Sequence, residues 1–261
     1  MQPVIPAYVA PLILAVFVVL AASVARIVAR AAADAGLPDP TRRRVAVTAT
    51  ILLGGWLLAA LLRAPAQPPL DAGGRGIVPA AFAVFGVLSF AVAFGALALS
   101  DAWRRTVAAI PVERLVALQT FRVLGFVFIS VWAIGSLPGR FALPAGLGDI
   151  AVGLAAPFVA VALARRTPGS RALALAWNTL GVIDLVTAVG LGTGLLVRLF
   201  APGTPLEPAA AMTMFPLVLV PTFGVPLAMI LHVLTYQALA RSGASDRRDQ
   251  RPLSPHAAAA R

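Results

Sequence analysis

The sequence predicts an all-α integral membrane protein with seven transmembrane helices, an outside N-terminus and a cytoplasmic C-terminus. Of its 261 residues 60% are hydrophobic and only 12% are charged, whereas soluble domains carry about a quarter charged residues. Apolar runs recur along the chain, and a run of about 18 residues is long enough to cross the hydrocarbon core as a helix. The arginines lie mainly between these runs.

Polar segments rich in proline and glycine separate the apolar runs, for example 64–75 (APAQPPLDAGGR), and favour turns outside the bilayer. The predicted spans are 4–25, 45–62, 77–99, 115–136, 141–164, 172–197 and 214–239. Residues 1–240 are expected to form one transmembrane domain. Residues 241–261 are polar and aperiodic, which predicts a disordered cytoplasmic tail. The short second span leaves a re-entrant loop as an alternative to full crossing.

The placement of arginine predicts the orientation. The chain has no lysine, and in the seven-span arrangement 16 of its 21 arginines fall on one side, four fall on the other and Arg122 lies inside the fourth span. Because cytoplasmic loops carry the excess of basic residues, the first side is expected to be cytoplasmic. The first run has basic residues only after it, the reverse of a signal peptide. The exclusive use of arginine suggests a GC-rich bacterial genome, and hence a bacterial inner (plasma) membrane.

Composition excludes several classes of function. The net charge of +11 is spread over the connections between spans, so the expected partner is the lipid bilayer rather than nucleic acid. The chain has no cysteine for a disulfide or thiolate metal site, and no lysine for a retinal Schiff base. His232 is the only histidine within the spans, which excludes haem held by two histidines and histidine-rich zinc sites. We therefore expect no cofactor and no metal.

Polar residues gather in the last four spans and form the predicted ligand or ion pathway. An unpaired charge inside the membrane costs about 2.5 to 3.5 kcal/mol on insertion scales, so the charged members must face one another or water. Counting 1.5 Å per helical residue places several of them in one layer, roughly 7 to 12 Å from the cytoplasmic ends. The predicted pathway residues are Gln119, Arg122, Asp149, Asn178, Asp184, His232 and Tyr236.

These residues support two non-enzymatic interpretations. The first is small-solute or proton-coupled transport through a polar cavity in the last four spans. Two aspartates and one arginine leave a net charge of minus one, so one aspartate is expected to exchange a proton or bind a cation. The second is a structural or interaction subunit, in which Arg122 forms a buried ion pair that fixes the helix register.

A third interpretation rests on a short motif. Gly146-Leu147-Gly148-Asp149 resembles the GxGD signature of intramembrane aspartic proteases of the presenilin and signal-peptide-peptidase type. The resemblance implies a catalytic pair of membrane aspartates, with Asp184 as the second. The chain departs from the family pattern in two ways: Asp184 follows the motif as Ile183-Asp184, where the family has an earlier Tyr-Asp, and the family's Pro-Ala-Leu element is matched only by Pro226-Leu227-Ala228.

Small residues predict close helix packing. Gly146 and Gly181 each stand three residues before an aspartate. Gly190 and Gly194 form a GxxxG pair near the outer end of the sixth span, which is typical of a helix face that dimerises. An oligomer through these two glycines is therefore a further expectation.

Overall fold

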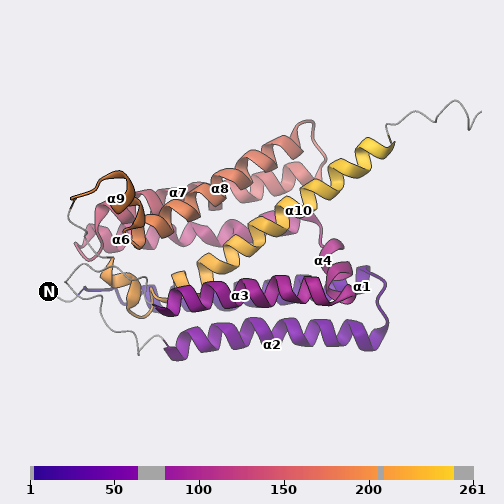
Figure 1. Cartoon of the computed structure of the whole chain (residues 1–261), viewed down its shortest axis with the longest axis horizontal. Coiled ribbons are helices and arrows are strands. Elements are labelled where there is room, and N and C mark those ends of the chain that lie inside the picture. The colour runs from indigo at the N-terminus through magenta and orange to yellow at the C-terminus, as the bar shows by residue number, and fades with distance from the viewer. Residues whose placement is uncertain (1–2, 64–79, 205–208, 250–261) are drawn as a thin grey trace, which may run out of the picture.

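The computed structural model describes residues 3–63, 80–204 and 209–249. Within them every regular element is a helix, so the all-helical class is confirmed (Figure 1). Six helices are long and apolar enough to cross a membrane, or seven if one bent pair counts as a single span. Parts of the predictions lie outside the described residues: the connection 64–75, the start of the third span (77–79), residues 205–208 and the end of the tail (250–261).

The first two helices, α1 (Val9–Asp34) and α2 (Asp39–Arg63), pack together as a hairpin. Both are longer than predicted. The first span was expected to end at Ala25, but α1 continues through Arg26 and Arg30, because long arginine side chains can extend their charge from a helix to the interface. Because α2 is one continuous helix of 25 residues and is among the helices long and apolar enough to cross a membrane, its geometry favours full crossing over the alternative of a re-entrant loop.

A sharp bend follows the third span. Helix α3 (Ala80–Leu99) and the short α4 (Asp101–Ala108) meet at 103°. The Arg104 guanidinium donates to the carbonyls of Leu97 and Ala98 at the end of α3, at 3.3 and 3.1 Å, and Arg105 donates to the carbonyl of Ala35 after α1, at 2.8 Å. These arginines satisfy carbonyls that helix ends leave without partners, and they fix α4 across the ends of α1 and α3.

The fourth span is not a uniform α-helix. It consists of α5 (Val112–Leu118), a 3₁₀ segment η2 (Gln119–Gly125) and α6 (Phe126–Ala133). A 3₁₀ stretch in the middle of a helix often marks a functional hinge or a strained sequence. The next two spans form a second hairpin, α7 (Gly139–Ala164) and α8 (Ser170–Gly192), and the short α9 (Leu195–Phe200) follows.

The last span also begins irregularly. A 3₁₀ turn η3 (Ala210–Thr213) and a π-helical turn η4 (Val220–Gly224) precede α10 (Val225–Asp249). The prediction of a helix from 214 is wrong at its beginning, because Pro216 and Pro221 lack the N–H that a helix needs. Helix α10 also continues past the predicted end of this span at residue 239, through Asp249, because each residue added to an existing helix gains a hydrogen bond.

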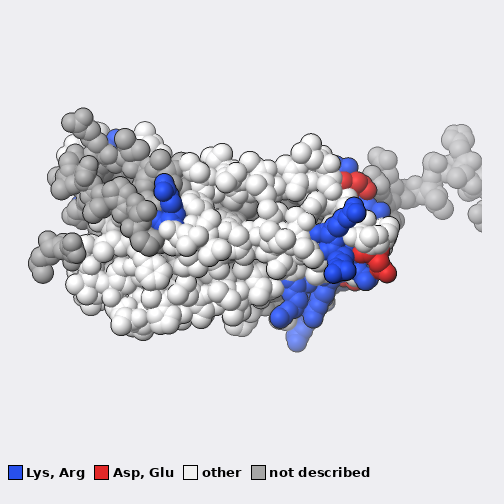
Figure 2. Space-filling view, turned by 90° about the horizontal axis from the view of Figure 1, so that it is seen from below, with Lys and Arg blue, Asp and Glu red and all other residues white. Residues whose placement is uncertain are grey.

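Helix α10 lies at the centre of the bundle. In Figure 1 it crosses between α3 on one side and the α7–α8 hairpin on the other, and it packs on α3, α5 and α8. The first three spans therefore lie on one side of α10, and the fourth to sixth spans on the other. The α1–α2 connection, the α4 region, the α7–α8 connection and the end of α10 meet at one end of the molecule, where Figure 2 shows most of the basic side chains on the visible face.

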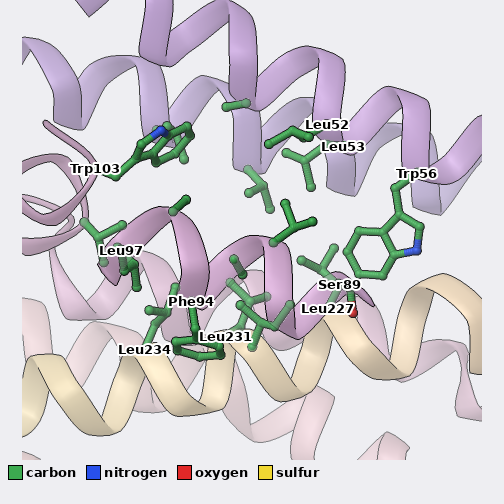
Figure 3. A pocket seen from close by; sticks show the side chains of 18 of the residues that line it. Leu52, Leu53, Trp56, Ser89, Phe94, Leu97, Trp103, Leu227, Leu231 and Leu234 are labelled. Carbon is green, nitrogen blue, oxygen red and sulfur yellow. The ribbon is translucent and has the colours of Figure 1, made fainter. Parts of the chain in front are cut away.

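An apolar cavity of about 430 Å³ lies between α1, α2, α3, α4, α5 and α10. Figure 3 shows Leu52 and Leu53 of α2 on one side of it, with Phe94 and Leu97 of α3 on the other. At one end of the cavity, the Trp56 indole N–H donates to the Thr222 carbonyl of η4 at 2.9 Å.

The packing of α7 on η2 generates a testable prediction. A Cβ atom at Gly146 would lie 2.8 Å from the Gly125 carbonyl oxygen and 2.7 Å from Ile129 Cδ1, whereas a Cβ at Gly95 of α3 would meet no atom within 4 Å. We expect Gly146→Ala to lower the free energy of unfolding by about 1 to 3 kcal/mol, through overpacking against rigid backbone. Gly95→Ala is the matched control and should leave it unchanged or raise it slightly. Denaturation with sodium dodecyl sulfate in mixed micelles measures both, and equal effects would contradict the packing.

Candidate functional site

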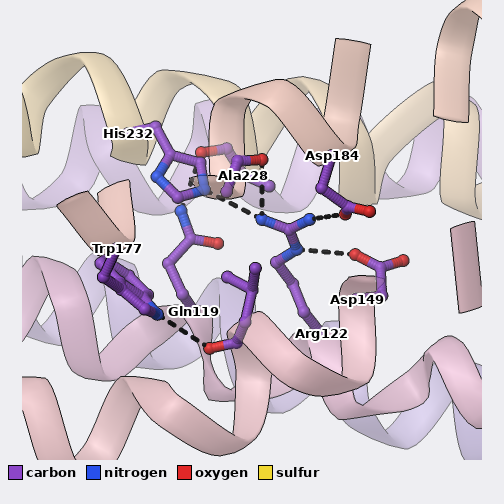
Figure 4. A network of polar contacts seen from close by, with 9 residues as sticks. Gln119, Arg122, Asp149, Trp177, Asp184, Ala228 and His232 are labelled. Carbon is purple, nitrogen blue, oxygen red and sulfur yellow. Dashed lines mark hydrogen bonds and ion pairs between the residues drawn. The ribbon is translucent and has the colours of Figure 1, made fainter. Parts of the chain in front are cut away.

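Six of the seven predicted pathway residues meet in one cluster around Arg122 (Figure 4). Gln119 and Arg122 come from η2, Asp149 from α7, Asn178 and Asp184 from α8, and His232 from α10. In a 3₁₀ helix residues three apart eclipse one another. The irregular segment therefore points Gln119 and Arg122 in the same direction.

The Arg122 guanidinium uses all three of its nitrogens. Its Nε donates to Asp149 Oδ1 at 2.6 Å, and its Nη2 donates to the Asp184 carboxylate. Its Nη1 donates to the Gly181 carbonyl at 3.2 Å and to His232 Nε2, 3.0 Å away. Arg122 is only 2% exposed, so these partners replace the water that a guanidinium would otherwise bind.

The hydrogen bonds fix the protonation of His232. Because arginine has no acceptor, His232 Nε2 must accept from Arg122. Its Nδ1 therefore carries the proton and donates to Asn178 Oδ1 at 2.7 Å. Asn178 in turn donates through Nδ2 to the His232 carbonyl at 3.1 Å. The imidazole is thus neutral, and both of its nitrogens are bonded.

Gln119 is completely buried and only partly satisfied. Its Nε2 donates to the Ala228 carbonyl at 2.9 Å, while its Oε1 has no hydrogen-bond partner among the residues that the structure describes. In Figure 4 Gln119 lies beside Arg122, on the side away from the two aspartates. A buried acceptor of this kind costs about 1 to 3 kcal/mol unless it finds a donor.

Tyr236, the seventh predicted residue, stands apart from the cluster. Its hydroxyl lies 2.7 Å from Thr179 Oγ1 in a half-buried position. Trp177, in contrast, packs against the cluster: its ring centroid is 5.6 Å from that of His232, and its indole N–H donates to the Val152 carbonyl at 3.1 Å. Trp177 therefore covers the side of the imidazole.

Glycines make room for the charged groups. A Cβ atom at Gly148 would overlap the Asp184 carboxylate, and one at Gly181 would overlap the His232 ring. The motif glycines thus have different neighbours: Gly148 makes room for α8, Gly181 for α10, and Gly146 for η2. The sequence analysis did not predict that Gly148 makes room for the Asp184 carboxylate. The position of Gly148 directly before Asp149 could have indicated it.

A small cavity adjoins the cluster. It measures about 30 Å³ and is bordered by Arg122 and Asp149, together with residues of α1, η2, α6, α8, η4 and α10. This is room for a water molecule but not for a solute. Neither Asp184 nor His232 lines this cavity, so it reaches only two of the predicted pathway residues, Arg122 and Asp149.

The predicted GxxxG face is not continuous. Helix α8 ends at Gly192, and Gly194 adopts a positive φ of 72° at the start of α9. A Cβ at Gly190 would lie 2.5 Å from Leu196 Cγ, so the protein's own α9 covers this glycine. Within the chain the two glycines thus serve a turn and an intrachain contact, and an oligomer through them stays a prediction.

The geometry differs from that of an aspartic protease or a metal site. An aspartic dyad shares one proton between its two carboxyl groups, whereas each carboxylate here takes a separate guanidinium N–H of Arg122. Among the residues that the structure describes, no group of three histidine, cysteine or acidic side chains could hold a metal ion. What the cluster offers is a pair of carboxylates that share one counter-ion.

The comparisons with known proteins identify the family. A family model described as a domain of unknown function (DUF8737) matches residues 77–240, more than half of the chain. The chain belongs to this family. The DUF8737 match runs from the third span to α10 and so contains every residue of the cluster, but it does not include α1 or α2. No curated protein and no solved structure is significantly similar to the chain.

Removing the guanidinium should destabilise the fold. Arg122→Gln leaves two carboxylates without a counter-ion, and we expect it to lower the free energy of unfolding by about 3 to 5 kcal/mol. Arg122→Lys should recover only part of this loss, because an ammonium cannot reproduce the planar fork of donors.

Arg42→Gln is the control for this experiment. Arg42 forms an exposed ion pair with Asp39 at 3.0 Å, and exposed pairs contribute about 0 to 1 kcal/mol. Denaturation in mixed micelles compares the three variants. Full rescue by lysine would show that charge alone, without the fork geometry, holds the cluster.

Proposed function

We propose that this multi-pass membrane protein moves protons, alone or coupled to a small solute, and that the Arg122 cluster is its proton-binding site. The observation that carries the proposal is the balance of charge in the cluster. Asp149 and Asp184 share one guanidinium, and His232 is neutral by its hydrogen bonds. With both carboxylates ionised, the cluster carries one uncompensated negative charge.

A single negative charge at membrane depth is costly, and intramembrane ionisable residues mark ion or proton pathways by default. One proton on either carboxylate makes the cluster neutral. A proton needs no binding pocket, which suits a cavity of about 30 Å³ at Arg122 and Asp149. Uptake and release of a proton is therefore the chemistry that this arrangement supports best.

The two aspartates are also the most accessible members of the cluster. Their side chains are 15% and 13% exposed, against 1% for Arg122. Asp149 borders the small cavity, which has room for a water molecule that could deliver a proton. Exchange is therefore expected at the carboxylates, while the guanidinium stays in place as the fixed counter-ion.

Movement of a solute would require the bundle to open. The small cavity lies between the 3₁₀ segment η2 and the π-helical turn η4, and such irregular turns are common at functional hinges. The backbone departs from α-helical hydrogen bonding on both sides of this cavity. We propose these two segments as the points at which the helices move.

A structural role for the cluster is the second candidate. It is favoured by the complete pairing of the Arg122 nitrogens with three helices. In that case the protein is a membrane subunit whose register is set by a buried ion pair. The two candidates predict different effects of replacing aspartate by asparagine. The replacement slows proton movement if the cluster binds protons, and it changes only assembly if the cluster is structural.

The orientation is a further proposal. The arginine-rich end of the molecule (Figure 2) is assigned to the cytoplasm by the positive-inside rule, which places the N-terminus outside and the C-terminus inside a bacterial plasma membrane. This orientation requires an odd number of spans, and therefore that α3 crosses the membrane.

Proton movement is tested in liposomes that contain the purified protein. A potassium gradient with valinomycin sets the membrane potential, and an enclosed pH-sensitive dye reports the proton flux. Asp149→Asn and Asp184→Asn should each slow the protein-dependent flux at least about tenfold, since each removes one proton-accepting group.

Asp39→Asn is the matched control, because Asp39 is a carboxylate 83% exposed at the start of α2. It should conduct as the unsubstituted protein does. If the two cluster variants fold and conduct normally, or if the unsubstituted protein passes no protons, the transport proposal fails. Rescue of a misassembled Arg122→Asp variant by Asp184→Arg, with no proton flux, would favour the structural role.

Orientation is tested by fusing reporters to the C-terminus in a bacterial host. A fluorescent protein that folds only in the cytoplasm should be bright, and a phosphatase active only outside should be silent. The same two reporters are also fused after residue 63 and after Ala108. If α3 crosses the membrane, the fusion after residue 63 lies outside and the fusion after Ala108 lies in the cytoplasm, so the two positions give opposite results. Matching results at these two positions would mean that α3 does not span the membrane.

A further inference from the structure

The apolar cavity on the other side of α10 has the size of a ligand site. Its volume is about 430 Å³, within the range of roughly 300 to 1,000 Å³ that is common for ligand pockets. Almost all of its wall is apolar. The Ser89 hydroxyl, one of the few polar groups there, already donates to the Gly86 carbonyl at 2.8 Å. Apolar cavities do not hold ordered water and bind hydrocarbons instead.

The cavity opens toward the lipid between α2 and α3. Some of its lining side chains are also on the molecular surface: Ile51 and Leu52 of α2 are 65% and 41% exposed, and Leu88 of α3 is 58% exposed. All three belong to helices of transmembrane length. A hydrocarbon chain can therefore enter sideways from the membrane, without passing through water.

A positive charge stands in line with this opening. Gly55 lines the cavity, and Arg44 precedes it by three turns on the same face of α2, about 16 Å along the axis. Arg44 is exposed and lies near the start of α2, next to Arg42 and Arg43. This places a cation where the headgroup of a lipid lies when its chain occupies the cavity.

We propose that the cavity binds one acyl chain of an anionic phospholipid from the arginine-bearing leaflet, with the lipid headgroup at Arg44. The hydrocarbon chain matches the apolar wall that Figure 3 shows between α2, α3 and α10, and the anionic headgroup matches the charge at the end of α2. The proposal is independent of proton movement, because it uses none of the groups around Arg122.

Two neighbouring glycines provide a matched test. Gly54 and Gly55 are both exposed in α2, and a Cβ on either would meet no atom within 4 Å, but only Gly55 lines the cavity. Gly55→Phe should therefore direct its ring into the cavity from a position with room at Cβ, whereas Gly54→Phe carries the same ring at a neighbouring position that does not line the cavity. Arg43 precedes Gly54 as Arg44 precedes Gly55, so Arg43→Gln is the matched control for Arg44→Gln.

The experiment is native mass spectrometry of the purified full-length protein with added phosphatidylglycerol or phosphatidylcholine of identical chains. We expect one tightly retained phosphatidylglycerol, which is lost severalfold in Gly55→Phe but kept in Gly54→Phe. Arg44→Gln should lower the preference for phosphatidylglycerol about fivefold, with a smaller change in Arg43→Gln.

Several outcomes would overturn the proposal. They are equal retention of both lipids, equal loss in the two phenylalanine variants, or the absence of a retained lipid. A dimer that forms with the unsubstituted protein and dissociates in Gly55→Phe would assign the cavity to a second copy of the chain instead.

Discussion

The guanidinium of Arg122 is the interaction on which the rest of the bundle depends. It stands on η2 and binds one group from α7, two from α8 and one from α10. Between membrane helices there is little hydrophobic driving force, because lipid is as apolar as the helix surfaces. A polar centre that joins four elements therefore fixes the register of the helices, because their apolar outer faces do not favour one relative position over another. The glycines at 146, 148 and 181 bring the helices close enough for it to form.

The residues of the centre could be read from the sequence, but their backbone could not. A charge inside an apolar run is conspicuous, and its cost implies a partner, so Arg122, Asp149 and Asp184 were predictable as a set. Nothing in residues 119–125 (QTFRVLG) distinguishes a 3₁₀ helix from an α-helix. That conformation depends on the tight contact of η2 with α7, at Gly125 and Gly146, which forms only in the assembled bundle.

The fold class follows from composition, while the helix ends depend on local chemistry. Hydropathy located the spans, but it placed the end of the first too early, because it counts Arg26 and Arg30 as breaks. It also could not anticipate the 103° bend after Leu99, where Arg104 and Arg105 bind the carbonyls at the ends of α3 and of α1. Hydropathy also does not separate the two faces of α10. One face lines the apolar cavity through Leu227 and Leu231, while the other brings His232 into the charged cluster.

The bonding of His232 gives the centre a direction. Donors run from Arg122 to the imidazole, from the imidazole to Asn178, and from Asn178 to the backbone of α10. The order cannot be reversed, because a guanidinium has nothing to accept with. A proton placed on His232 Nε2 would take the electron pair that accepts from Arg122 and set two N–H groups head to head. His232 therefore holds Arg122 in place and does not exchange protons. Any proton that the cluster takes up or releases has to pass through Asp149 or Asp184.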